Sequence, residues 1–114
     1  MAEDRYLDKA QARDIEEELF ATRRQQASRN MPVPLPRQNF WEMVGKLLAG
    51  IDAEIQDMLM NGITGLRLQN AQKRQANIRR IASELSRKRL VTMMQYLASQ
   101  SLRTDSQLGI NQEL

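Results

Sequence analysis

Residues Ile63–Leu102 read ITGLRLQNAQKRQANIRRIASELSRKRLVTMMQYLASQSL, and this stretch decides the fold. It contains no proline, and its only glycine, Gly65, lies near its beginning. Proline and glycine interrupt helices more strongly than any other residues. The stretch therefore predicts one long helix of about 55 Å, which begins near Thr64 or Leu66. We expect two shorter helices to pack on it.

The distribution of apolar residues changes along this predicted helix. Its first half has one apolar face, formed by Ala71, Ile78, Ile81, Ala82 and Leu85. From Leu90 onward, nearly every side is apolar, through Leu90, Val91, Met93, Met94, Tyr96, Leu97 and Ala98. A helix that is apolar all round is typically buried all round. We therefore expect an oligomer interface at this end, and the alternative is that the first helix covers its second side.

Two shorter helices are predicted before the long one. Asp8 followed by Gln11 has the form of a capping box, although Asp4 is an alternative start, and the first helix should run to about Ser28. Asn39 followed by Glu42 gives the second helix a similar start, and Asn61-Gly62 should end it. Its predicted apolar stripe has alternating spacings of three and four, at Trp41, Val44, Leu48, Ile51, Ile55 and Met58. Three further apolar residues, Phe40, Leu47 and Leu59, broaden this stripe. Gly45 and Gly50 suggest that another backbone approaches this helix closely.

A proline-rich connector, Met31–Arg37 (MPVPLPR), separates the two shorter helices. Its three alternating prolines exclude helix and favour an extended strap, so Val33 and Leu35 can press on a helical surface. The predicted fold is an all-α three-helix bundle with one long C-terminal helix. Residues 1–102 form the helical domain, and 103–114 read as a flexible tail or a linker towards a possible missing domain.

The composition argues against catalysis. The chain has no histidine and no cysteine, which removes most nucleophile–base pairs and most transition-metal sites. The remaining carboxylates, lysines and hydroxyls form no convincing constellation, so we expect no enzyme, no cofactor and no metal site. The longest apolar run is too short to span a bilayer, and the acidic N-terminus is unlike a signal peptide. A soluble cytoplasmic or nucleoid-associated protein is expected.

Charge is divided unevenly along the chain. Residues 1–62 carry eight basic and eleven acidic side chains, whereas residues 63–104 carry nine basic side chains against Glu84 alone. The candidate contacts for phosphates or for an acidic partner are Lys73, Arg74, Arg79, Arg80, Arg87 and Lys88. Three interpretations remain open. The basic series is a solvated or internally paired face, it meets an acidic protein surface, or it binds DNA or RNA.

Three features together resemble the helical domain of archaeal GINS subunits. They are the Leu35-Pro-x-x-Asn-Phe-Trp-Glu42 entry into the second helix, the loop into a long helix with Asn70-Ala71, and the basic-apolar string Ile78–Ala82 with Arg87–Leu90. The resemblance covers roughly residues 15–100. In the GINS branch with the helical domain first, a small β domain follows, and this sequence ends before one.

The resemblance implies a non-catalytic scaffold subunit of a DNA replication complex. GINS bridges the MCM helicase, the Cdc45/RecJ-like protein and polymerase or primase, and its assemblies are pseudo-symmetric tetramers. The resemblance also implies an oligomer contact, with a second copy or a homologous subunit in a dimer or tetramer. It assigns this contact to Leu90, Val91, Met94 and Leu97. The alternative function is a small basic helical protein that binds nucleic acid as a dimer.

Overall fold

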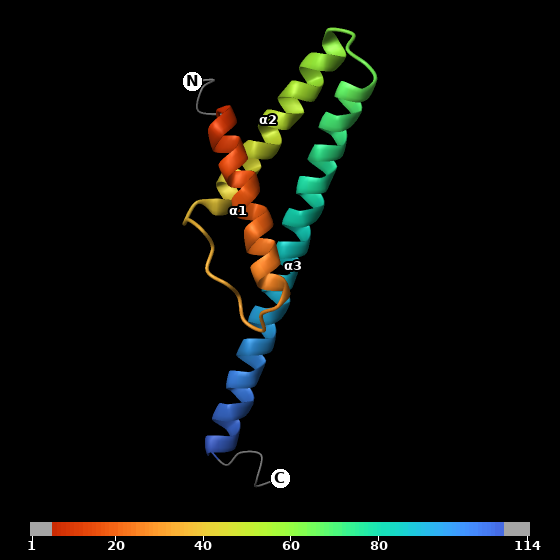
Figure 1. Ribbon diagram of the computed structural model, residues 1–114. Coiled ribbons are helices and arrows are strands. Elements are labelled where there is room, and N and C mark those ends of the chain that lie inside the picture. The colour runs from red at the N-terminus through yellow and green to blue at the C-terminus, as the bar shows by residue number, and fades with distance from the viewer. Residues whose placement is uncertain (1–5, 109–114) are drawn as a thin grey trace.

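The computed structural model describes residues 6–108 of the chain. It contains three helices, α1 (Lys9–Ala27), α2 (Phe40–Met60) and α3 (Leu66–Leu108). The α2 and α3 helices form an antiparallel hairpin, and α1 lies across both of them (Figure 1). The molecule is elongated, with extents of 72 × 29 × 20 Å. The predicted all-α bundle with a long last helix is confirmed.

The α1 helix begins at the predicted capping box. The Asp8 carboxylate accepts a 2.8 Å hydrogen bond from the Gln11 backbone N–H, and the Gln11 side chain accepts one of 3.1 Å from the Asp8 N–H. These bonds satisfy two N–H groups that a helix start otherwise leaves unpaired. The buried face of α1 then consists of Ile15, Leu19, Thr22 and Gln26.

The connector is extended, as predicted, and Val33 is buried while Leu35 packs against the core. Two charged contacts attach the connector to helices. Arg37 forms a two-bond ion pair with Glu18 of α1, with N–O distances of 2.5 and 3.1 Å. The Arg89 guanidinium of α3 donates a hydrogen bond to the carbonyl of Val33. The connector thus bridges α1 and α3.

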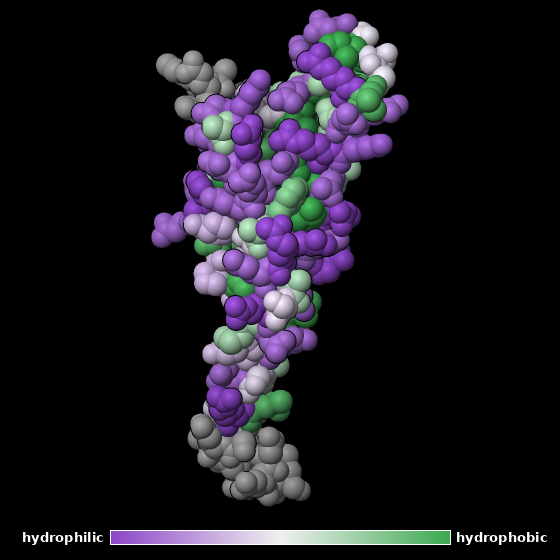
Figure 2. Space-filling model, viewed as in Figure 1, coloured by the Kyte–Doolittle hydropathy of each residue, from purple (hydrophilic) through white to green (hydrophobic). Residues whose placement is uncertain are grey.

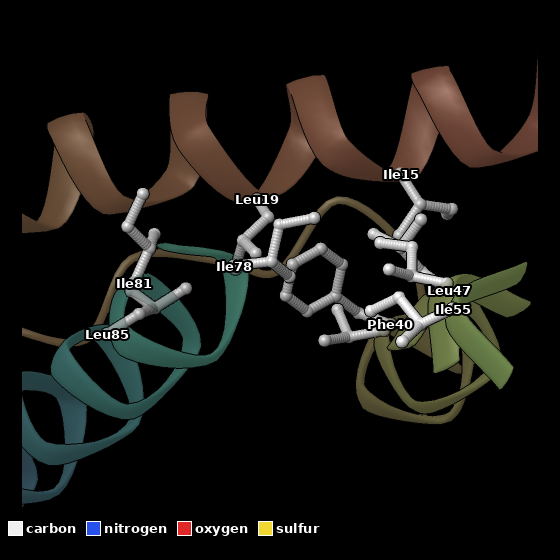
Figure 3. Close-up of a cluster of buried hydrophobic side chains, with 10 residues drawn as sticks. Ile15, Leu19, Phe40, Leu47, Ile55, Ile78, Ile81 and Leu85 are labelled. Carbon is white, nitrogen blue, oxygen red and sulfur yellow. The ribbon is translucent and has the colours of Figure 1, made fainter. Parts of the chain in front are cut away.

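The buried face of α2 is shifted from the centre of the predicted stripe towards Phe40 and Leu47, which broaden that stripe. Phe40 and Leu47 are buried, with exposed fractions of 0% and 2%, whereas Trp41 is 38% exposed and Leu48 lies partly buried at the edge of the core. Phe40 lies among apolar side chains from all three helices (Figure 3). Both sets of residues fit a helical period, so packing against α1 and α3 decides which aromatic ring is buried.

The predicted ends and glycines of α2 have mixed outcomes. Asn39 is the N-cap of α2, as predicted, but its side chain makes no capping hydrogen bond. The prediction of a close backbone at Gly45 and Gly50 is wrong. Among the described residues, a Cβ at Gly45 would meet nothing within 4 Å, and one at Gly50 would meet only the Tyr6 ring at 3.9 Å. Gly62 has φ +69°, which confirms the left-handed turn predicted after Asn61.

The α3 helix extends to Leu108, beyond the predicted end at Leu102. Residues 103–108, which were predicted to belong to a flexible tail, therefore form the last turns of this helix. No proline or glycine interrupts the chain before Gly109, and adding a residue to an existing helix costs little free energy. The rest of the predicted tail, residues 109–114, lies outside the described residues.

Candidate functional site

The C-terminal part of α3 presents the apolar side chains from which an interface was predicted. Leu90, Met94 and Leu97 have exposed fractions of 56%, 60% and 60%, and that of Val91 is 42%. Thr92, in the middle of this set, is buried at 1%. Leu90 and Met94 each lie two residues from Thr92, or about 200° around the helix, so both face away from the bundle.

Helix α1 does not cover this part of α3. It ends at Ala27, and α3 projects past α1 and the connector (Figures 1 and 2). Met93, Tyr96 and Leu102 are also 42%, 41% and 63% exposed. The sixteen residues that follow Thr92, up to Leu108, correspond to about 24 Å of helix. We call Leu90, Val91, Met93, Met94 and Leu97 the apolar end.

A second exposed apolar group lies at the opposite end of the molecule, where α2 turns into α3. Leu59, Met60 and Leu66 are 49%, 87% and 70% exposed, and Figure 2 shows apolar surface at this tip. We did not single out this group in the sequence. The sequence feature that could have indicated it is the position of Met60 and Leu66 on either side of a five-residue turn with two glycines.

Most of the predicted basic series lies on the exposed surface of α3, and one member turns towards α1. Lys73, Arg80 and Arg87 are seven residues apart and therefore share one face. Arg79 and Lys88, their neighbours, are also exposed. Arg74 instead forms an ion pair with Glu16 of α1, with an Nε–Oε1 distance of 2.9 Å. The structure thus separates Arg74 from the rest of the series.

Glu84, the single acidic residue between positions 63 and 104, links α3 to α1. Its two carboxylate oxygens accept hydrogen bonds of 3.0 Å each from Arg80 of α3 and Arg23 of α1. The bond from Arg80, followed by that from Arg23, lowers the pKa of the Glu84 carboxyl from its ordinary value. Glu84 is therefore held between two cations, and the spacing of Arg23 and Glu84 in the sequence gives no sign of their pairing.

A groove of about 420 Å³ lies between the first half of α1 and the middle of α2. Its apolar floor includes Leu47 and Ile51, and its charged lining residues are Lys9, Arg13, Glu16, Lys46, Glu54 and Arg74. Within residues 6–108, no group of three or more acidic side chains lies close enough together to hold a metal ion. The groove therefore offers mixed charge over an apolar floor.

Comparison with known proteins gives no match to any family model, to any curated protein or to any solved structure. Across the described part of the chain, no helix has the length and apolar character needed to cross a membrane. Two surfaces of α3 are therefore the candidate sites, namely the apolar end and the exposed basic residues that precede it.

Proposed function

We propose that this chain is a non-catalytic assembly subunit that binds a second copy or a homologous subunit through the apolar end of α3. The observation that carries the proposal is the exposure of Leu90, Met94 and Leu97 on the side facing away from their own bundle. A contiguous exposed apolar patch commonly marks a protein–protein contact. The projecting helix can insert between subunits and bury sides of itself that α1 and the connector leave open.

Burial of these side chains would supply the free energy of assembly. Burying a leucine or methionine side chain contributes about 1.5–3 kcal/mol relative to full exposure. Because these side chains are about half exposed, each has about half of that contribution left to gain. Several such side chains from each subunit would together form the apolar centre that stable interfaces contain.

The replication role is the more specific part of the proposal. The resemblance to archaeal GINS subunits supports it, carried by Leu35–Glu42 and by the basic-apolar strings of α3. In this role, the assembled subunits would bridge the MCM helicase, the Cdc45/RecJ-like protein and polymerase or primase. The chain itself would supply binding surfaces and no catalytic group.

Light scattering behind size exclusion tests the assembly. We expect a dimer or tetramer for the wild-type chain and a monomer for the double variant Leu90→Asp/Met94→Asp, because two carboxylates cannot be buried unpaired. The matched control is Met60→Asp/Leu66→Asp, at the other exposed apolar group, and it should assemble like wild type. Circular dichroism should show the same helix content for all three proteins. A monomeric wild-type chain, or an assembled Leu90→Asp/Met94→Asp variant, would contradict the proposal.

A second experiment tests the replication role separately. Immobilised wild-type chain should retain purified archaeal MCM or Cdc45/RecJ-like protein, and the monomeric variant should retain less of either. An assembled chain that retains none of these proteins would remove the replication role and leave self-assembly standing.

A further inference from the structure

We propose that the basic face of α3 binds the phosphate backbone of a nucleic-acid duplex without reading its sequence. This basic face consists of Lys73, Arg79, Arg80, Arg87 and Lys88, all of them exposed. The proposal does not depend on the assembly proposed above, because these residues precede the apolar end and lie in a single chain.

The basic face is long and straight enough to follow a duplex. Lys73, Arg80 and Arg87 follow one line along a helix, and the rise of fourteen residues from Lys73 to Arg87 spans about 21 Å. Double-stranded DNA carries one negative charge per about 1.7 Å of its axis, which gives about twelve charges over that length. Lys73, Arg80 and Arg87 would therefore have phosphates within reach along this line, and Arg79 and Lys88 flank the line on its two sides, each about 100° around the helix.

The protein's own acidic residues leave most of these charges without a partner. Among the side chains of residues 6–104, the salt bridges include Arg80 of the basic face, which pairs with Glu84, but none involves Lys73, Arg79, Arg87 or Lys88. Glu84 already accepts a second hydrogen bond, from Arg23. The interpretation of a fully paired basic series therefore does not hold for these four residues, and their counterions are available for release on binding.

The other side chains of this stretch favour phosphates over a protein surface. No large apolar side chain is exposed between Leu66 and Leu90 of the described chain, whereas protein interfaces have an apolar centre. The remaining exposed residues here are mainly polar or small, including Gln72, Ala76, Asn77 and Ser83. Lysine, arginine, serine, asparagine and glutamine side chains make most protein contacts to phosphate oxygens.

The aromatic residues favour a duplex over a single strand. Proteins that bind single strands stack the bases on aromatic side chains. From Lys73 to Lys88 there is no aromatic residue, and the aromatic residue of α3, Tyr96, lies beyond this stretch. A duplex exposes its phosphates and keeps its bases stacked, so the basic face can hold it through charge alone.

The test measures binding of a fluorescent duplex of about 24 base pairs by anisotropy, at about 50 mM and about 200 mM salt. The variant replaces four unpaired cations of the basic face by glutamine, at Lys73, Arg79, Arg87 and Lys88. The matched control replaces four exposed cations of α1 and the connector by glutamine, at Lys9, Arg13, Arg24 and Arg29. Both variants lose the same charge. Binding of the duplex to the monomeric Leu90→Asp/Met94→Asp chain should also be measured at both salt concentrations.

We expect the wild-type affinity to fall about 100-fold between the two salt concentrations, because a complex with about four phosphate contacts has a salt dependence of this size. The basic-face variant should bind more than about tenfold more weakly at the lower salt concentration, with a much reduced salt dependence. The control should stay within about threefold of wild type. The monomeric chain should keep the same dependence on the basic face.

Three outcomes would overturn the proposal. Equal losses in the variant and the control would show attraction to net charge alone. Equal or tighter binding of labelled polyglutamate, weakened by the same four substitutions, would assign the face to an acidic protein. Tighter binding of a single strand of the same length would exclude the duplex as the preferred ligand.

Discussion

The side-chain oxygen of Gln26 in α1 accepts a 2.8 Å hydrogen bond from the backbone N–H of Val33 in the connector. The same amide donates a 2.9 Å bond to the carbonyl of Met31, and Gln26 is completely buried. Since proline has no N–H group, this part of the connector has few donors of its own. One glutamine therefore fixes the path of the connector as it leaves α1.

Replacement of Gln26 by leucine should destabilise the fold by about 2 kcal/mol. The substitution leaves the buried Val33 N–H and the partly buried Met31 carbonyl without a hydrogen-bond partner. Urea denaturation followed by circular dichroism measures this loss. The control is Gln25→Leu, at the exposed neighbouring position, which should change stability by less than about 0.5 kcal/mol. Equal midpoints for Gln26→Leu and wild type would show that the two bonds contribute nothing.

Phe40 and Trp41 should differ sharply in their contributions to stability. Phe40 is completely buried, so Phe40→Ala should cost about 3–5 kcal/mol through lost burial and the cavity left behind. Trp41 is 38% exposed and meets Phe40 edge-on, with ring centres 5.1 Å apart. We expect Trp41→Ala to cost less than half as much, again by urea denaturation. A larger loss of stability for Trp41→Ala than for Phe40→Ala would show that Trp41 contributes more to the core than Phe40 does.

The Glu84 ion pairs should make stability depend on pH. Hydrogen bonds from Arg80 and Arg23 lower the pKa of Glu84 in the folded chain, so the carboxylate stabilises the fold above its ordinary pKa. This contribution is lost as the pH falls through the lowered pKa. The difference in urea midpoint between wild type and Glu84→Gln should therefore be positive at about pH 6 and shrink towards about pH 3.

The control for Glu84 is Glu17→Gln, at an exposed residue for which residues 6–108 provide no ion pair. Its midpoint should follow that of wild type across the pH range. A midpoint difference for Glu84→Gln that is constant with pH would show that the effect comes from packing and not from charge.

Two glycines should respond in opposite directions to alanine. Gly45 lies inside α2 with open space around it, so Gly45→Ala should raise stability by about 0.5–1 kcal/mol through better helix propensity. Gly62 has a positive φ, so Gly62→Ala should lower stability by about 1–2 kcal/mol. Thermal and urea unfolding measure both changes. A loss of stability in Gly45→Ala would indicate a neighbour at that position, such as a partner subunit.

Local sequence was sufficient to predict the three helices and several of their ends. The Asp8–Gln11 capping box and the Gly62 turn were correct because both depend on residues only a few positions apart. The predicted apolar stripe included both Phe40 and Trp41, and periodicity did not decide which ring is buried, because a helical period tolerates either residue on the apolar face. The end of α3 was placed too early because loss of apolar periodicity does not by itself end a helix.

The candidate surfaces were predictable in part. The positions of the basic and apolar residues of α3 follow from the sequence, but their exposure does not. The pairing of Arg74 with Glu16 and of Arg23 with Glu84 joins residues about sixty positions apart, and only the packing of α1 on α3 brings them together.

The sequence by itself determined a long helix that is basic in its middle and apolar near its end, because both properties depend on residue type and helical spacing. Tertiary structure alone decided which of those residues remain accessible. The connector reaches α3 at Arg89, and Thr92 is buried, but Leu90 and Met94 face the other way. Exposure depends on where the neighbouring helices end, and spacing within one helix contains no information about that.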